Sequence, residues 1–171
     1  MNPMQAPRLE KLTLNMGAGG AGQPLENART LIERLTGKKA VTTKAKKRSP
    51  EFHLRKGDEI GVKVTLRGKA AADFLGKALQ TRDNELPAKS FDGNGNVAFG
   101  VKEYIDFPGA KYDPKLGMLG FDVCVSLRRP GANVARRRIA PRRLPRRHRV
   151  SAAEAAAFME KNFGVKVTAG E

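Results

Sequence analysis

Cysteine and tryptophan are nearly absent from this chain of 171 residues, which has one cysteine, Cys124, and no tryptophan. A single thiol cannot form an internal disulfide or supply a cysteine-based metal cluster. Neither an oxidising compartment nor a zinc site is therefore indicated. We predict that Cys124 is an inert strand residue and that the protein uses no metal and no other cofactor.

Long apolar runs are missing as well. No stretch approaches the roughly 18 consecutive apolar residues of a membrane span, and residues Met1 to Pro7 lack the apolar run of a signal peptide. We expect a cytoplasmic protein from these two observations.

Groupings of residues that would indicate catalysis are also lacking. The two histidines, His53 and His148, lie in basic and polar segments, and the acidic residues are scattered along the chain. No Ser-His-Asp or Cys-His set can be assembled from them. The sequence therefore predicts a protein that is not an enzyme.

Positive charge is what the chain has in excess: 33 lysines and arginines face 17 acidic residues, for a net charge of +16. The segment from Arg128 to Arg149 holds ten arginines and no acid. Arginine binds phosphate through two parallel hydrogen bonds and stacks on bases, so this segment predicts an RNA-binding arm. Its arginines are Arg128, Arg129, Arg136, Arg137, Arg138, Arg142, Arg143, Arg146, Arg147 and Arg149.

An anionic membrane surface or a solvated, disordered face could explain the same surplus of charge. However, Pro130, Pro141 and Pro145 interrupt the continuous apolar helix face that a membrane-surface helix needs. Ten arginines in 22 residues are also too dense for an ordinary solvated face. We favour an extended arm that becomes ordered on RNA, where phosphate contacts offset the entropic cost.

The hydrophobic pattern predicts an α+β fold. Apolar residues alternate as in strands around residues 12–16, 60–66, 97–101 and 121–127, and shorter strands are expected near residues 38–48 and 165–167. Helical spacing predicts helices at residues 25–36, 69–80 and 152–162, the last beginning at a Ser151-Ala152-Ala153-Glu154 capping box. This order indicates one domain over residues 1–171. We expect a mostly antiparallel sheet with helices on one face and a long arginine-rich loop at about residues 128–149.

One glycine motif favours a different class of protein. The segment Gly17-Ala18-Gly19-Gly20-Ala21-Gly22 fits GxGxxG between a predicted strand and a predicted helix, as in dinucleotide-binding enzymes. Such enzymes need an acidic residue about 20 positions later, where this chain has Val41-Thr42-Thr43-Lys44. A dinucleotide-binding enzyme is therefore kept only as an alternative. Backbone amides that approach an RNA phosphate explain the glycines better.

Several motifs in order along the chain point to one known family. They are Pro7-Arg8-Leu9-Glu10-Lys11-Leu12-Thr13-Leu14-Asn15-Met16-Gly17, Thr43-Lys44-Ala45-Lys46-Lys47, Ile60-Gly61-Val62-Lys63-Val64-Thr65-Leu66-Arg67 and Phe91-Asp92-Gly93-Asn94-Gly95-Asn96. A second group is Tyr112-Asp113-Pro114 through Gly117, Gly120-Phe121-Asp122-Val123, Arg128-Arg129-Pro130-Gly131 and His148-Arg149. Over most of its length, the chain resembles the archaeal and eukaryotic branch of the large-subunit ribosomal protein five family.

The resemblance implies a structural constituent of the large ribosomal subunit that binds 5S rRNA and helps attach it in the central protuberance. It carries the family's 5S-binding positions onto Asn15, Thr65 and Lys38, the last where glutamine is usual. Lys63 and Arg67 alternate away from the apolar side of their strand and extend this face. The full set expected to bind 5S rRNA is Asn15, Lys38, Lys44, Lys46, Lys47, Lys63, Thr65 and Arg67.

Further partners follow from the resemblance alone. It implies that P-site tRNA lies near Phe52, His53, Arg55 and Lys56, and that a protein of the small-subunit protein thirteen family contacts Asp106, Lys111 and Asp113. Large-subunit rRNA and the large-subunit protein eighteen family are the other expected partners. A general polyanion or single-stranded RNA binder remains an alternative, although the chain has only two tyrosines and no tryptophan on which bases could stack.

Overall fold

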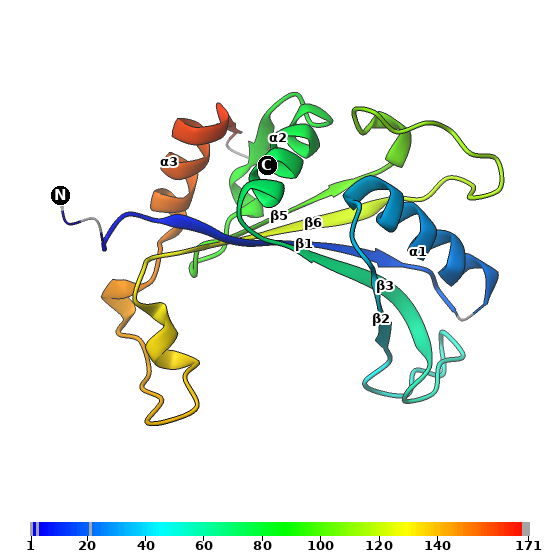
Figure 1. The fold of residues 1–171 in the computed structure, drawn as a ribbon, viewed down its shortest axis with the longest axis horizontal. Coiled ribbons are helices and arrows are strands. Elements are labelled where there is room, and N and C mark those ends of the chain that lie inside the picture. The colour runs from blue at the N-terminus through cyan, green and yellow to red at the C-terminus, as the bar shows by residue number, and fades with distance from the viewer. Residues whose placement is uncertain (1, 3, 21, 169–171) are drawn as a thin grey trace. The chain divides into compact units, whose positions relative to one another are not determined.

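The computed structural model describes residues 2, 4–20 and 22–168, which form an α+β fold (Figure 1). A five-stranded antiparallel sheet has the order β2-β3-β1-β6-β5, and β4 and β7 form a separate parallel pair. The helices are α1 (Gln23–Thr36), α2 (Lys69–Gln80) and α3 (Ala152–Phe163). The strands are β1 (Arg8–Gly17), β2 (Val41–Lys44), β3 (Glu59–Leu66), β4 (Glu85–Pro87), β5 (Asn96–Val101), β6 (Phe121–Arg128) and β7 (Lys166–Thr168). The predicted α+β class and antiparallel sheet are confirmed.

The chain forms two compact units, each built from separate segments of the sequence. One unit, here called the arm unit, comprises Met1–Leu12, Arg67–Phe99 and Cys124–Glu171. The other, the loop unit, comprises Thr13–Leu66 and Gly100–Val123. The expectation of a single domain over residues 1–171 stays a prediction.

In the loop unit, α1 packs against β3 (Figure 1). The helix buries Leu25, Ala28, Leu31 and Ile32, which recur at helical spacing. It ends at Gly37, whose φ of 64° is the left-handed conformation that glycine adopts without strain. Its apolar stripe and the inward side chains of β3 form the core of this unit.

Gly61 explains why β3 can approach β1 closely. A Cβ atom at this position would lie 2.7 Å from the carbonyl oxygen of Met16 and 3.0 Å from the hydroxyl of Thr43. On its other side, β3 pairs with β2 in antiparallel register, with Val41 opposite Lys63. A glycine is therefore required by space rather than by backbone conformation.

In the arm unit, α2 buries Ala71, Phe74, Leu75, Ala78 and Leu79. The capping box predicted for α3 is confirmed. The Ser151 hydroxyl accepts a hydrogen bond from the Glu154 amide at 3.3 Å, and the Glu154 carboxylate accepts one from the Ser151 amide at 3.1 Å.

A turn at residues 92–95 leads into β5. The Asp92 carboxylate accepts hydrogen bonds from the amides of Asn94 and Asn96 at 2.8 and 2.7 Å. Gly95 has a φ of 79°, and a Cβ there would lie 2.7 Å from Cβ of Val150. The turn thus packs against the residue just before α3.

The structure differs from the sequence-based expectation in two elements. β1 begins at Arg8 rather than near residue 12, because its first residues are half-buried and do not alternate clearly between apolar and polar. β4 was not predicted, since three residues that include Pro87 carry no periodicity and are extended only by pairing with β7. None of the described helices combines the length and the apolar character needed to cross a membrane.

Candidate nucleic-acid interface

The outward face of β1 and β3 in the loop unit carries three of the residues expected to bind 5S rRNA. Asn15 is exposed between the buried Leu14 and Met16 on β1. Lys63 and Thr65 are exposed on β3, where Val62, Val64 and Leu66 are buried. Because β1 and β3 are neighbours in the sheet, an amide, an ammonium group and a hydroxyl lie on the face turned away from the buried side chains.

The lysines after β2 extend this basic character. Lys44 lies 4.0 Å from the Glu59 carboxylate; the Lys44 side chain is largely exposed and that of Glu59 is half-buried. Lys46 and Lys47 are exposed, whereas Ala45 is buried and exchanges backbone hydrogen bonds with Asp58 and Gly57. The backbone hydrogen bonds of Ala45 hold this segment in place, while the side chains of Lys46 and Lys47 project into solvent.

Two further members of the predicted 5S-binding set are exposed just outside the helices and strands. Lys38 is exposed in the turn that follows Gly37, at the end of α1. Arg67 is exposed and belongs to the arm unit. Asn15, Lys63 and Thr65 are therefore the members of the set that lie together on two neighbouring strands.

The loop expected to lie near tRNA is closed at its base and presents an aromatic ring. Ser49 and Leu54 exchange backbone hydrogen bonds of 3.1 and 3.0 Å, and His53 adopts a φ of 52°. Phe52 is 69% exposed. Arg55 and Lys56 are also exposed, so the ring is accompanied by positive charge.

The segment expected to contact the small subunit is partly engaged within the loop unit. Asp106 and Lys111 are exposed. Asp113 accepts a hydrogen bond from Arg34 on α1 at 2.8 Å, and its amide donates one to the Tyr104 hydroxyl at 2.9 Å. The Arg34 hydrogen bond is the main cause that lowers the pKa of Asp113 below its usual value. Asp113 thus ties the loop to α1, a role that the sequence did not indicate.

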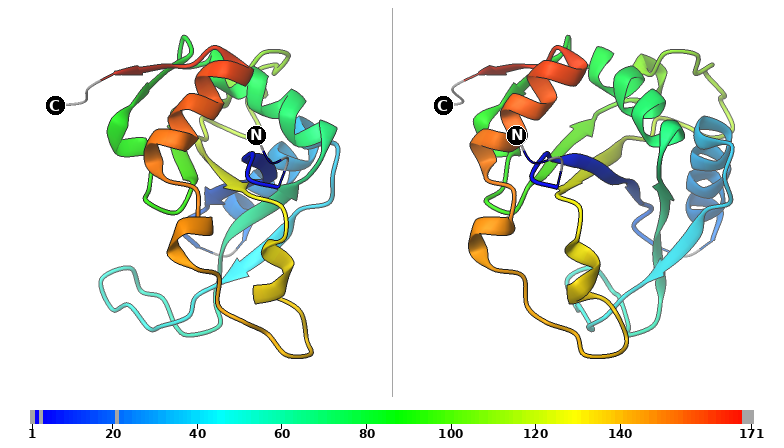
Figure 2. Two further views of the ribbon diagram at one scale, coloured as in Figure 1. Left: turned by 90° about the vertical axis from the view of Figure 1, so that its left-hand side faces the viewer. Right: turned by 60° about the vertical axis from the view of Figure 1, so that its left-hand side comes forward.

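The arginine arm folds back on itself (Figure 2). It leaves β6, forms one 3-10 turn at Ala132–Ala135 and another at Arg146–His148, and continues into α3. The Arg129 guanidinium donates to the Arg147 carbonyl oxygen at 2.9 Å, and the Arg142 amide donates to the Val134 carbonyl oxygen at 3.1 Å. These bonds join the outgoing and returning limbs, so the arm is not simply extended.

Two carboxylates outside the arm hold its base. Glu10 on β1 forms ion pairs with Arg128, at 3.1 Å, and with Arg136, and Glu154 on α3 forms one with Arg129. The Arg129 side chain is only 13% exposed. Burial raises the pKa of Glu10, but the nearby guanidinium groups of Arg128 and Arg136 outweigh it and leave the pKa below its usual value.

The ten arginines thus divide into two groups. Besides the three paired with carboxylates, Arg137 donates to the Ala140 carbonyl oxygen at 2.9 Å and Arg149 to the Asn94 side chain at 3.1 Å. The remaining five are exposed, and their side chains make no hydrogen bond or ion pair with any described residue. These are Arg138, Arg142, Arg143, Arg146 and Arg147. Nothing in the local sequence distinguishes the two groups, because the acidic partners lie far away in the chain.

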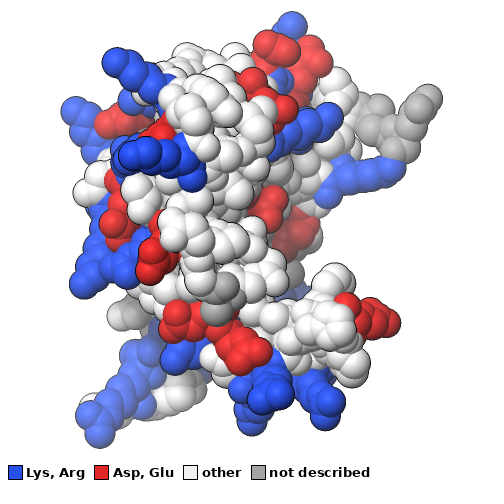
Figure 3. Space-filling model, turned by 90° about the vertical axis from the view of Figure 1, so that its right-hand side faces the viewer, with Lys and Arg blue, Asp and Glu red and all other residues white. Residues whose placement is uncertain are grey.

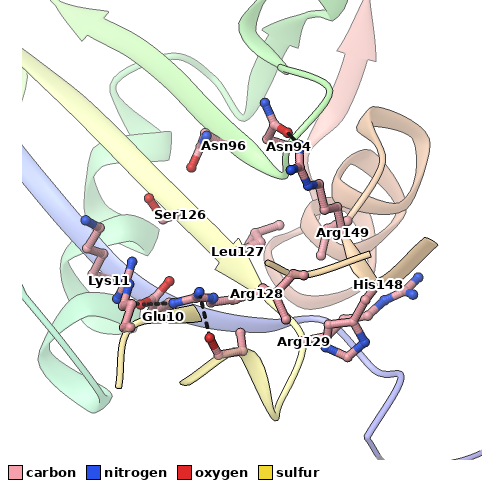
Figure 4. Close-up of a pocket in the computed structure, with 14 residues that line it drawn as sticks. Glu10, Lys11, Asn94, Asn96, Ser126, Leu127, Arg128, Arg129, His148 and Arg149 are labelled. Carbon is pink, nitrogen blue, oxygen red and sulfur yellow. Dashed lines mark hydrogen bonds and ion pairs between the residues drawn. The ribbon is translucent and has the colours of Figure 1, made fainter. Parts of the chain in front are cut away.

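A pocket of about 280 Å³ opens at the base of the arm (Figure 4). All its lining residues belong to the arm unit. Its hydrogen-bonding side chains include Lys11, Asn94, Asn96, Ser126, His148 and Arg149. Of these, the sequence singled out only Arg149 as a site residue, although the outward positions of β1, β5 and β6 could have indicated Lys11, Asn96 and Ser126. Their donors and acceptors suit phosphates and base edges.

Figure 3 shows one face of the molecule, on which both basic and acidic side chains are exposed. No group of His, Cys, Asp or Glu among the described residues could hold a metal ion. The GxGxxG segment includes Ala21, which lies outside the described residues.

Comparison with known proteins finds ribosomal proteins, in agreement with a basic surface that suits RNA. A family model described as ribosomal protein L5 matches residues 2–55, and a second model, described as the C-terminus of the same ribosomal protein family, matches residues 59–166. The chain is 50% identical to the large ribosomal subunit protein uL5 of Sulfurisphaera tokodaii over 171 residues, which cover 99% of this chain and 97% of that protein. The alternative of a dinucleotide-binding enzyme is therefore wrong. This chain belongs to the uL5 family of ribosomal proteins and is a structural, non-enzymatic constituent of the large ribosomal subunit.

Proposed function

We propose that this protein binds 5S rRNA through the outward face of β1 and β3 and helps attach that RNA to the large subunit in the central protuberance. The observation that carries the proposal is the exposure of Asn15, Lys63 and Thr65 on neighbouring strands, each between buried apolar residues. Amide and hydroxyl groups can recognise the RNA 2′-hydroxyl and backbone, and an ammonium group can bind phosphate. Lys38, Lys44, Lys46, Lys47 and Arg67 would add phosphate contacts around this face.

The distribution of charge in the loop unit favours the outward face of β1 and β3, rather than α1, as the RNA-binding surface. The exposed or half-buried side of α1 carries Glu26 and Glu33 alongside Arg29 and Arg34, and Arg29 and Glu33 form an ion pair at 3.2 Å. Its charges therefore largely balance. By contrast, Asn15, Lys63 and Thr65 include no acid, and the Glu59 carboxylate at the start of β3 lies 4.0 Å from the Lys44 ammonium group. An RNA backbone therefore meets less repulsion there.

Three further contacts belong to the same proposal. The five arm arginines without a partner among the described residues bind large-subunit rRNA, and the loop at Phe52, His53, Arg55 and Lys56 approaches P-site tRNA. Asp106, Lys111 and Asp113 contact the small-subunit protein thirteen family and form an intersubunit bridge. The large-subunit protein eighteen family is a further partner, to which no residue of this chain is assigned. The exposed ring of Phe52 supports the second contact, since aromatic rings stack on unpaired bases.

Binding to folded 5S rRNA, tRNA and a scrambled 5S sequence tests the main contact at near-physiological salt. We expect selective binding to 5S rRNA, weakened several-fold by Asn15→Ala and by Thr65→Ala, because one hydrogen bond contributes about 0.5–1.5 kcal/mol. Thr30→Ala is the matched control, since Thr30 is exposed on α1. Equal binding to all three RNAs, unchanged by either substitution, would mean that the protein is a general polyanion binder.

The tRNA contact can be tested separately. Phe52→Ala removes the ring without changing charge, so we expect weaker binding to tRNA and unchanged binding to 5S rRNA. Met118→Ala is the matched control because Met118 is another exposed apolar residue of the loop unit. An equal effect of Phe52→Ala on both RNAs would contradict a dedicated tRNA contact.

A further inference from the structure

The tip of the arginine arm presents an exposed aliphatic side chain. Ile139 is 82% exposed, the largest fraction among the exposed large hydrophobic residues described, which include Phe52 at 69% and Val41 at 58%. Burial of an isoleucine side chain is favourable and its exposure to water is not. A single exposed aliphatic residue is common on protein surfaces and does not by itself indicate a binding site. The charge and the backbone conformation around Ile139 are therefore considered next.

The surroundings of Ile139 are cationic. Arg136, Arg137 and Arg138 precede it, and Arg142 and Arg143 follow closely. All of them are exposed, and no acidic residue lies in the arm. A surface of this charge is complementary to the phosphates of RNA and attracts RNA in preference to an uncharged partner.

The backbone around Ile139 is held in a bend. The next residue, Ala140, has a φ of 48°, a left-handed conformation that residues with a side chain rarely adopt. The Arg137 guanidinium donates to the Ala140 carbonyl oxygen at 2.9 Å, and the Arg142 amide donates to the Val134 carbonyl oxygen at 3.1 Å. An uncommon conformation persists where the surrounding bonds hold it, and here the bend keeps Ile139 at the outside of the tip.

We infer that Ile139 is a wedge that inserts between bases of large-subunit rRNA, while the neighbouring arginines bind the flanking phosphates. Apolar side chains, including isoleucine, leucine and methionine, are used in this way by proteins that unstack a base step of a duplex. The inserted side chain replaces base-to-base stacking with apolar contact and becomes buried itself. The inference rests on the proposed contact between the arm and rRNA.

Fluorescence of 2-aminopurine tests the inference directly. The full chain is titrated with RNA hairpins that carry 2-aminopurine beside a one-nucleotide bulge, where unstacking costs least. The unaltered protein should raise the fluorescence, because an unstacked 2-aminopurine is less quenched. Ile139→Ala and Ile139→Ser should abolish the rise and weaken binding about tenfold, equivalent to about 1.4 kcal/mol. Ile139→Met, which keeps a wedge, should restore both.

Two controls make the result specific. Met118→Ala removes an exposed apolar residue elsewhere and should change neither signal. Thermal unfolding of the Ile139 variants should match the unaltered protein, because so exposed a side chain contributes little to the core. An unchanged fluorescence rise in Ile139→Ala, or no rise with the unaltered protein on any hairpin, overturns the inference.

The double substitution Arg142→Ala and Arg143→Ala separates the inference from the function on which it rests. Weaker hairpin binding in this variant, with no effect of Ile139→Ala, means that the arm binds RNA but Ile139 is not a wedge. Unchanged hairpin binding in the double variant means that the arm contact itself fails, and the wedge fails with it. Selective binding to 5S rRNA through β1 and β3 would stand in either case.

Discussion

The Glu10 carboxylate lies 3.1 Å from the guanidinium of Arg128, although the two residues are 118 positions apart in the sequence. Glu10 is 18% exposed and Arg128 24% exposed, and Glu10 also pairs with Arg136 inside the arm. Hydrogen bonds between charged groups are stronger than neutral ones, and a half-buried pair is screened less than a surface pair. One carboxylate on β1 therefore fixes two arginines that composition alone would assign to RNA.

Replacement of this carboxylate should loosen the base of the arm. We expect Glu10→Gln to lower the free energy of unfolding by about 1–3 kcal/mol, because two guanidinium groups lose their charged partner. Urea denaturation measures the loss. Glu26→Gln on α1 is the matched control, since Glu26 is exposed and should change stability by no more than about 0.5 kcal/mol. Equal stability of the two variants would contradict an anchoring role for Glu10.

The same ion pairs predict a dependence on pH. Because the pKa of Glu10 in the folded protein is lowered from 4.5, its stabilising effect is complete above the unfolded pKa and is lost as pH falls through the folded pKa. The difference in unfolding free energy between the unaltered protein and Glu10→Gln should therefore be constant near neutral pH and shrink below about pH 4.5. Parallel denaturation series from about pH 7 to about pH 3 check this. If this difference in unfolding free energy instead grew on acidification, the pKa of Glu10 would be raised in the folded protein, and the prediction would be wrong.

The strands and helices could be predicted because their information is local. Ile60 to Leu66 alternates between apolar and polar residues, and Ser151 to Glu154 forms a capping box within four residues. The outward positions of Asn15 and Thr65 follow from the same alternation. Their assignment to 5S rRNA came from the family resemblance and stays a prediction.

The arrangement of the arm could not be predicted, since it depends on contacts between distant residues. Arg129 and Arg143 are indistinguishable by sequence, yet Arg129 is largely buried against Glu154 and Arg143 is exposed. β4 was missed for the same reason, because only its pairing with β7 makes it a strand. Patterns within a few residues therefore predict helices and strands. Which arginines pair with carboxylates and which stay exposed depends on contacts between residues far apart in the sequence.

The capping box and the ion pair at Glu154 can be separated by two substitutions. Ser151→Ala removes the hydroxyl that accepts from the Glu154 amide and should cost about 1 kcal/mol of stability. Glu154→Gln keeps an oxygen that can accept from the Ser151 amide but removes the charge opposite Arg129, whose Nε is buried without a hydrogen-bond partner among the described residues. We expect Glu154→Gln also to cost about 1 kcal/mol.

Hydrogen exchange distinguishes these two losses. Ser151→Ala should speed amide exchange in the first turn of α3, whereas Glu154→Gln should speed it in the arm, at the Arg142 amide that bonds to Val134. The same exchange pattern in both variants would indicate that the cap and the ion pair act as one unit.

A pair of glycine substitutions tests the close approach of β3 to β1. Gly61→Ala places a Cβ about 2.7 Å from the Met16 carbonyl oxygen and should destabilise the protein by about 1–3 kcal/mol. Gly76→Ala is the opposite case, because Gly76 lies within α2 with nothing within 4 Å of its added Cβ. It should stabilise the protein by about 0.5–1 kcal/mol through higher helix propensity. Thermal unfolding measures both, and a stable Gly61→Ala variant would refute the steric argument.

The division of the arm arginines predicts how binding to large-subunit rRNA depends on salt. Affinity falls with salt in proportion to the counterions that bound cations release, with a log–log slope of about −0.7 to −0.9 for each phosphate contacted. Arg143→Ala removes an exposed guanidinium and should make the slope less steep by about one such step. Arg137→Ala should change the slope less. It should weaken binding mainly because it removes the hydrogen bond from Arg137 to the Ala140 carbonyl oxygen, which holds the bend of the arm. Lys77→Ala on α2 is the control for loss of a distant charge. Equal changes of slope for Arg143→Ala and Lys77→Ala would show that the arm acts only through the total charge of the protein.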